Sequence, residues 1–287
     1  MAGLEVSIVV PTRDRPRSLE RCLEAVAGQS GVSSLEIIVV DDGTKDGDAV
    51  ARAVARHGGA RLVRLEGRGP AAARNAGVGV AQHPVVCFTD DDCEPSPDWA
   101  SRLAGALQAG VHAAGGSTIN VRPDSPFALA SGAISQALRQ SEPGLHPHAA
   151  FASTANLAVL LEVARTVVFD ESFSFASEDR DWCVRLTAAG YELASVPEAV
   201  VVHHRNDGLT DFWRRYVRYG EGSYRFRQIH SDGRPARSGF YAGLVREGFE
   251  RGVAAGTLVC VSQIATAVGY TKEAVRRQAC AGSPDSS

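Results

Sequence analysis

Apolar runs of strand length alternate with amphipathic stretches through the first hundred residues of the chain. In the amphipathic stretches, apolar residues recur every three or four positions, as they do along one face of a helix. The alternation is typical of β–α–β units and predicts an α/β fold with a mainly parallel, Rossmann-like sheet flanked by helices. The expected strands are Val6–Val10, Leu35–Val40, Ala60–Leu65 and Val85–Phe88, with helices from Pro16, at Asp46–His57 and at Ala71–Ala81.

The pattern is less regular from residue 99 to residue 206. A short strand is expected at Ala113–Val121, and Phe151–Val159 is expected to be β-like or irregular. Pro197 is expected to divide a last extended segment into two short strands, because proline cannot donate a ladder hydrogen bond. The expected helices are Trp99–Gln108, Ser125–Gln140, Glu162–Val168 and Asp179–Ala189, with a loop at Pro143–His148.

The C-terminal part differs in composition. Residues 212–229 interleave aromatic and arginine side chains, and residues 252–271 carry no charge. The uncharged stretch is about long enough to span a bilayer, but its polar residues favour a buried pair of helices instead. We expect a helical extension over residues 207–287, with at most a weak membrane or protein contact through residues 212–278.

Composition and charge are those of a soluble globular protein. The 287 residues are 44% hydrophobic and 22% charged, and the net charge of −3 gives no reason to expect a nucleic-acid partner. The six cysteines include no C-x-x-C pair, so neither a zinc site nor a disulfide framework is indicated. The first residues lack the basic and apolar regions of a signal peptide. We expect a cytoplasmic protein, with peripheral binding to the inner face of the membrane as the alternative.

Three consecutive carboxylates, Asp90-Asp91-Asp92, directly follow the buried strand at Val85–Phe88. The carboxyl ends of parallel strands meet at one edge of a sheet, so Pro11-Thr12 and Asp41-Asp42 are expected to lie close by. Hard divalent ions such as Mg²⁺ or Mn²⁺ prefer oxygen ligands and often bridge to a phosphate. The triplet therefore predicts a divalent metal site; a solvated acidic turn is the alternative. Two prolines after it, Pro95 and Pro97, are expected to forbid regular structure.

Two further positions favour a phosphorylated nucleotide ligand. Asp42 ends a strand, where a carboxylate can accept the N–H of a nucleobase, although Asp and Gly also favour plain turns. Arg74 lies in a helix whose small residues begin at Gly69, and helix N-termini favour anions. Because arginine keeps its charge, Arg74 suits a diphosphate; close packing of an alanine-rich helix is the alternative.

A candidate base and a candidate metal ligand occur later in the chain. Asp179 begins a helix that Trp182 is expected to pack against the core, and its ordinary pKa near 3.9 predicts that it is ionised at neutral pH. It can then take a proton from a hydroxyl; a stabilising acidic first turn is the alternative. His203 and His204 follow a strand, where either imidazole can complete a metal site or be structural.

Together these residues resemble the family 2 nucleotide-sugar glycosyltransferases with the A-type, Rossmann-like fold. The resemblance runs from Val6 to about His203 and rests on four motifs in the expected order. They are the Ser7–Asp14 segment, Ile37–Gly43 with its acidic pair, the D-x-D-like Phe88–Asp92, and Glu178-Asp179 with its following helix. The resemblance implies a catalytic domain at residues 1–206, with a nucleotide-binding half at 1–110 and an acceptor and base half at 111–206.

The resemblance also implies roles for single residues. Asp92 would bind the metal together with His203, for which His204 is the reserve, while Asp90 would support the site. Asp179 would be the catalytic base of an inverting transfer. The nucleotide would be bound by Pro11, Thr12, Asp14, Asp42, Arg74, Asp90 and Asp91, and the acceptor side would be supported by Trp99, Glu178 and Trp182.

The implied reaction moves a sugar from a nucleotide-diphosphate sugar, with UDP expected, to an acceptor hydroxyl on a saccharide, lipid-linked molecule, small molecule or peptide. The Q-x-x-R-W motif of processive synthases is not found, which favours transfer of a single sugar. Three other classes of protein fit the sequence less well. A sugar-phosphate nucleotidyltransferase would need glycine after the first strand, an aspartyl-phosphate hydrolase would have threonine in place of Glu94, and a non-catalytic carbohydrate-binding protein would not need Asp179.

Overall fold

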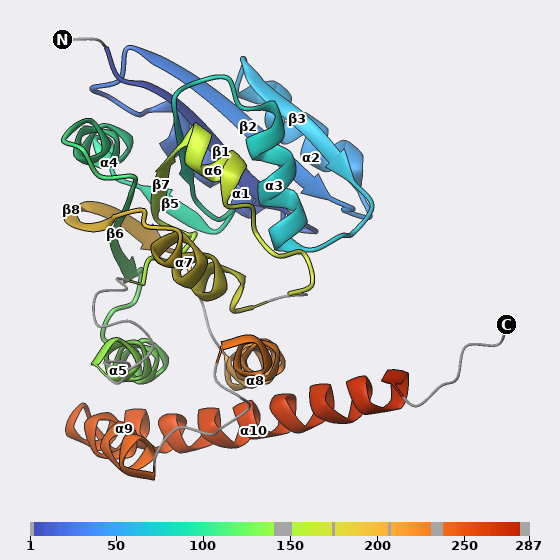
Figure 1. Ribbon diagram of the computed structural model, residues 1–287, viewed down its shortest axis with the longest axis vertical. Helices are drawn as coiled ribbons and strands as arrows, with labels where there is room; N and C mark the ends of the chain where they lie inside the picture. Colours follow the sequence, from blue (N-terminus) through green and yellow to red (C-terminus); the bar gives the residue numbers. More distant parts are fainter. Residues whose placement is uncertain (1–2, 141–150, 174–175, 206–207, 231–237, 282–287) are drawn as a thin grey trace, which may run out of the picture. The chain divides into compact units, whose positions relative to one another are not determined.

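The computed structural model describes residues 3–140, 151–173, 176–205, 208–230 and 238–281 (Figure 1). Residue contacts divide the chain into two compact units. The first comprises residues 1–121, 149–174 and 178–205, and the second comprises residues 122–148, 175–177 and 206–287. Residues 122–148, which the sequence assigns to the catalytic domain, thus group with the C-terminal helices. The loop expected at Pro143–His148 lies outside the described residues.

Within the described residues, eight strands of the first unit form one sheet in the order β3-β2-β1-β4-β7-β6-β8-β5. The strands β1 to β4 are parallel, which confirms the predicted β–α–β arrangement. Beyond β4 the sheet is mixed, because β7 is antiparallel to both of its neighbours and β5 is antiparallel to β8. The strands are β1 (Glu5–Thr12), β2 (Ser34–Asp42), β3 (Ala60–Leu65), β4 (Val85–Phe88), β5 (Cys93–Pro95), β6 (Ala113–Asn120), β7 (Leu157–Leu160) and β8 (Leu193–His203).

Helices cover both faces of this sheet (Figure 1). Successive residues of a strand point to opposite faces, so Val6, Ile8 and Val10 belong to one hydrophobic cluster and Val9 to another. The first cluster includes α1 (Pro16–Ala27), α2 (Gly47–Arg56) and α4 (Trp99–Gln108). The second includes α3 (Pro70–Val80), α6 (Leu161–Thr166) and α7 (Glu178–Ala188). The sheet is therefore buried on both faces, as its continuous apolar strands require.

The segment after the aspartate triplet is more regular than predicted. Cys93–Pro95 forms the edge strand β5, which pairs with residues 201–203 of β8. The expectation that the prolines forbid regular structure is therefore wrong. Pro95 is tolerated because it lies at the end of an edge strand, where the sheet does not need a hydrogen bond from its backbone nitrogen.

The strand β8 is continuous through Pro197, whereas two separate strands were expected. The pairing with β6 shifts from Gly116 opposite Val196 to Ser117 opposite Val200, so residues 197–199 bulge out of the ladder. A bulge accommodates a proline, since the extra residue makes no ladder hydrogen bond. Gly116 is required there, because a Cβ atom would lie 2.1 Å from the carbonyl oxygen of Ala199. The bulge lets β8 continue to His203.

The second unit is helical. It contains α5 (Pro126–Gln140), α8 (Leu209–His230), α9 (Ser238–Glu250) and α10 (Val253–Ala281), packed around Phe212, Tyr216 and Val259. The backbones of α8 and α10 approach closely at Gly269, where a Cβ atom would lie 1.8 Å from the carbonyl oxygen of Val217. By length and composition alone, Val253–Gln278 is suited to cross a membrane, and 39% of an apolar 18-residue stretch within it is buried inside the structure.

Candidate active site

The three aspartates lie at the carboxyl end of β4, where two side chains from the end of β1 and the loop after it meet them. Thr12 Oγ1 donates a hydrogen bond to Asp91 Oδ2 at 2.8 Å. Arg15 Nη1 lies 3.1 Å from Asp91 Oδ1 and 2.9 Å from Asp92 Oδ2. The parallel pairing of β1 with β4 thus brings Thr12 to the triplet, as the sequence predicts.

The aspartates differ in their electrostatic surroundings. Burial raises the pKa of Asp91 to about 7, although Arg15 opposes the shift. Burial also acts to raise the pKa of Asp92, but the hydrogen bond and charge of His203, followed by the charge of Arg15, outweigh it and hold that pKa well below its usual range. Asp92 is therefore ionised over the whole physiological pH range, as a metal ligand must be.

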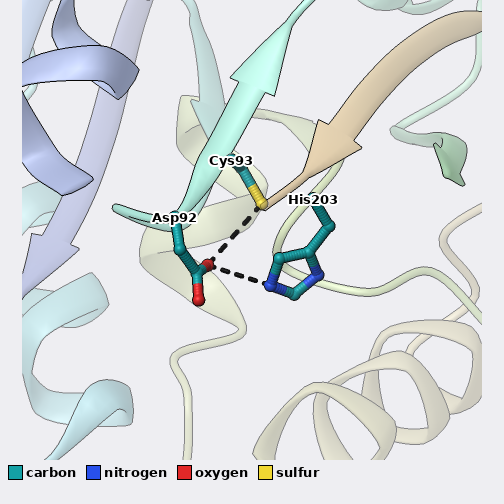
Figure 2. Close-up of side chains that lie close together, drawn as sticks. All are labelled: Asp92, Cys93 and His203. Carbon is teal, nitrogen blue, oxygen red and sulfur yellow. Dashed lines mark hydrogen bonds and ion pairs between the residues drawn. The ribbon is translucent and has the colours of Figure 1, made fainter. Parts of the chain in front are cut away.

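Two side chains that can ligate a metal, Cys93 and His203, lie beside Asp92 (Figure 2). His203 ends β8, and its Nε2 lies 2.9 Å from Asp92 Oδ1. The ligand atoms of Asp92, Cys93 and His203 all lie within 4.8 Å of one another. His204 is instead bound to Glu94, with Nε2 and Oε2 2.6 Å apart. The structure thus brings His203, rather than His204, to Asp92, and these donors fit a divalent transition-metal ion.

Arg74 connects two of the predicted site segments. Its side chain is 4% exposed, with Nη2 2.9 Å from Asp90 Oδ1 and Nη1 2.8 Å from Glu178 Oε1. Both terminal nitrogens of Arg74 are therefore engaged by carboxylates. This position therefore gives no support to the predicted diphosphate contact. Arg74 instead links α3 to the aspartate triplet and to α7.

Asp179 lies in the first turn of α7, which is anchored by a buried tryptophan. The indole nitrogen of Trp182 donates to Val167 O at 2.6 Å, and the ring stacks on Phe169 at 5.4 Å between centroids. Burial, followed by the charge of Glu178, raises the pKa of Asp179 to about 7. The expectation that Asp179 is fully ionised at neutral pH is therefore wrong. A base with a pKa near the working pH is well matched to proton transfer.

The predicted nucleotide-binding aspartates hold loops at the same edge of the sheet. The Oδ1 atom of Asp42 accepts the backbone N–H of Arg68 at 2.7 Å, and Oδ2 accepts that of Gly69 at 2.9 Å. Asp14, at φ 57°, accepts the N–H of Lys45 at 2.9 Å through Oδ1. Pro11 is half-buried within β1. These contacts preserve the shape of the loops, while a contact with a nucleobase stays a prediction.

The structure adds three residues that the sequence analysis did not single out: Arg15, Cys93 and Asn156. Asn156 Oδ1 accepts the indole N–H of Trp99 at 2.7 Å, and Trp99 is fully buried, so this tryptophan supports the site from within the core. Arg15 and Cys93 directly adjoin motifs that were identified, and that proximity was a usable signal. Asn156 lies in an irregular stretch with no pattern to identify it.

Comparison with known proteins agrees with this fold. The profile described as glycosyl transferase family 2 matches residues 7–150. Glycosyltransferase AglE from Haloferax volcanii is 28% identical over 222 residues, which cover 76% of this chain and 72% of that protein. The pre-mycofactocin glycosyltransferase from Mycobacterium tuberculosis is 28% identical over 235 residues, 79% of this chain. These residues cover 48% of that relative, so the chain spans about half of its length.

Solved structures show the same fold. The mannosyltransferase PcManGT from Pyrobaculum calidifontis, in complex with GDP-Man and Mn²⁺, has a TM-score of 0.63 at 20% identity, covering 99% of this chain and 77% of that one. Glucosyl-3-phosphoglycerate synthase from Mycobacterium tuberculosis, in complex with Mn²⁺, UDP-Glc and phosphoglyceric acid, has a TM-score of 0.58 at 20% identity, with 79% of each chain covered. The fold is thus that of the A-type glycosyltransferases, a class of enzymes. Within that class, the chain belongs to glycosyl transferase family 2.

Proposed function

We propose that the protein transfers a single sugar, with inversion, from a nucleotide-diphosphate sugar to an acceptor hydroxyl. The observation that carries this proposal is the gathering of charged side chains around the aspartate triplet at the sheet edge. An ionised Asp92 lies beside His203, and Arg74 links the adjacent Asp90 to the helix that carries Asp179. A site for a cation and a candidate base are therefore held in one unit of the structure.

The donor side would use Asp92 and His203. These residues would hold a Mn²⁺ or Mg²⁺ ion, which when bound supplies positive charge to the diphosphate leaving group. Two structural neighbours contain Mn²⁺, one with GDP-Man and one with UDP-Glc, which supports a nucleotide-sugar donor. We propose UDP as the first nucleotide to test, with GDP as the alternative.

The acceptor side would use Asp179. Its carboxylate would accept the proton of the acceptor hydroxyl while that oxygen attacks the anomeric carbon from the face opposite the leaving nucleotide. Glu178 and Arg74 would set the charge around Asp179, because the first raises its pKa and the second lowers it. The class of acceptor is open among saccharide, lipid-linked, small-molecule and peptide hydroxyls.

The donor assignment predicts metal-dependent stabilisation by the nucleotide. In the presence of Mn²⁺, UDP at about 100 times its Kd should stabilise the protein by about 2.7 kcal/mol, which corresponds to a rise in Tm of about 5 °C or more. Thermal unfolding followed by circular dichroism measures this rise, with GDP and dTDP in parallel.

Chelation by EDTA should remove most of the stabilisation. An equal rise of Tm in EDTA would contradict the metal assignment. Turnover of the matching nucleotide sugar separates an enzyme from the alternative of a non-catalytic binding protein, which would be stabilised without releasing the nucleotide.

We further propose that α10 contacts the surface of a membrane, at the inner face if the protein is cytoplasmic. Four apolar residues of α10 are exposed, at spacings close to whole turns: Val253, Ile264, Val268 and Val275. Residues 252–271 carry no charge, so this face of the helix presents no charged side chain over that length. An interfacial helix buries such a face among lipid headgroups.

Sedimentation with phospholipid vesicles tests this contact. The wild-type protein should sediment with the vesicles, and the double substitution Ile264→Asp and Val268→Asp should leave it in the supernatant. Ile119→Asp, which changes an equally exposed residue on β6, is the matched control and should change nothing. Wild-type protein that stays in the supernatant, or a double variant that alters only the oligomeric state, would overturn the membrane contact. Cell fractionation checks the cytoplasmic location.

A further inference from the structure

Cys93 lies beside the two residues to which we assign the metal. In the antiparallel pairing of β5 with β8, Cys93 is directly opposite His203. Residues directly opposite each other project to the same face of a sheet, with Cβ atoms about 4.5–5.5 Å apart. Backbone pairing, rather than a flexible side chain, thus holds the thiol next to the imidazole (Figure 2).

The distances are compatible with one shared ion. Asp92 Oδ1 lies 2.9 Å from His203 Nε2 and 4.0 Å from Cys93 Sγ. A tetrahedral ion with bonds of about 2.0–2.2 Å to N and O and about 2.3 Å to S separates its donors by about 3.3–3.6 Å. The observed separations fall on either side of that value. Shifts of about half an ångström would bring Asp92 to the tetrahedral separation from both of its partners. The third pair, Cys93 Sγ and His203 Nε2, lies within 4.8 Å and would have to approach by at most about 1.2 Å.

Two of the three donors are buried, and the third is partly open to solvent. Cys93 is 1% exposed and His203 is 8% exposed, while Asp92 is open enough to admit an ion. Within the described part of the chain, this is the one group of three metal-ligating side chains found. Among the described residues, the three other buried cysteines, Cys22, Cys87 and Cys183, belong to no such group.

We propose that Asp92 Oδ1, Cys93 Sγ and His203 Nε2 form an O, S, N site for a thiophilic divalent ion such as Zn²⁺ or Co²⁺. This inference rests on the proposed function, since two of its ligands are those assigned to the catalytic metal. A thiophilic ion replaces the thiol proton, which passes to solvent, and a metal–sulfur bond forms. Mg²⁺ prefers oxygen ligands and leaves the thiol protonated. Cys93 therefore sets which ion the site retains.

Titration of the metal-free full-length protein with Co²⁺ tests the site by absorption spectroscopy. The wild-type protein should develop a sulfur-to-cobalt charge-transfer band in the near ultraviolet. Cys93→Ser should lose that band and bind Co²⁺ at least about tenfold more weakly, since even outer partners of metal ligands contribute 10–100-fold. Its Mg²⁺ affinity should change by less than about twofold. Cys87→Ala, a buried cysteine in β4 outside the group, should keep the band.

A wild-type protein that binds Co²⁺ without a charge-transfer band overturns the proposal and leaves the proposed function intact. A Cys93→Ser variant that keeps the band also overturns it. The wild-type spectrum decides the matter by itself if Cys93→Ser does not fold. If Asp92→Asn binds Co²⁺ and Mn²⁺ as tightly as the wild-type protein, the metal assignment of the proposed function fails as well.

Discussion

Replacing Asp179 by Asn should lower kcat by about 10²–10⁴-fold and change the affinity for the nucleotide by less than about twofold. The amide has the shape of the carboxylate but cannot accept a proton from the acceptor hydroxyl. Nucleotide binding should persist because the residues assigned to the metal lie on other elements: Asp92 in the turn before β5 and His203 at the end of β8. Steady-state kinetics and isothermal titration calorimetry measure the two quantities separately.

The pH profile supplies an independent check on Asp179. Transfer requires the ionised carboxylate, so the rate should fall as the pH drops through the pKa of about 7. A divalent ion held by Asp92 and His203 would add positive charge to the site and favour the ionised carboxylate, so the acidic limb would then lie at lower pH. Asp98→Asn, at an exposed position before α4, should reproduce both the rate and the limb of the wild-type protein. Turnover of Asp179→Asn within tenfold of wild type would remove Asp179 as the base.

The charged side chains of the site form two bridged groups, which share the aspartate triplet. Arg15 bridges Asp91 and Asp92, and Arg74 bridges Asp90 and Glu178. Each aspartate of the triplet therefore has an arginine partner in the absence of any bound ion. The two arginines thus compensate the repulsion among the neighbouring carboxylates.

The elements near the triplet were predictable because local pattern and sheet geometry agree. Apolar runs and helical periodicity determine β1 to β4 and the helices between them, and the parallel order of these strands follows from the right-handed crossover. The meeting of Thr12 with Asp91 was therefore foreseeable. In the second half, pairing between distant segments decides the outcome. The antiparallel β7 and the edge strand β5 depend on partners that local sequence does not reveal.

The site was predictable in residue type but not in side-chain partner. Position after a strand or at a helix start singled out the aspartate triplet, the His203-His204 pair and Asp179. The family resemblance then selected Asp92 and His203 among them. The sequence assigned Arg74 to a diphosphate, since the pairing of this arginine with Glu178 joins residues that are 104 positions apart. It also took an ordinary pKa for Asp179, because burial and the neighbouring Glu178 charge exist only in the folded chain.

Replacing Arg74 by Met should lower the free energy of unfolding by about 3–5 kcal/mol, the usual cost of leaving a buried ion pair without one partner. Arg74 is 4% exposed, and its removal leaves Glu178, whose side chain is 8% exposed, without its cation. Methionine fills a similar volume, so lost packing contributes little. Urea unfolding monitored by circular dichroism measures the change.

Arg68→Met is the matched control, because Arg68 is 61% exposed and pairs with Glu171 at the surface. Exposed pairs contribute about 0–1 kcal/mol, so this variant should unfold close to wild type. Equal losses in the two variants would show that Arg74 does not hold the elements together. Activity gives a second readout: Arg74 lowers the pKa of Asp179, so its removal should move the acidic limb of the pH–rate profile upward. If Arg74→Met loses stability but its pH–rate profile keeps the acidic limb of the wild-type protein, the role of Arg74 is structural only.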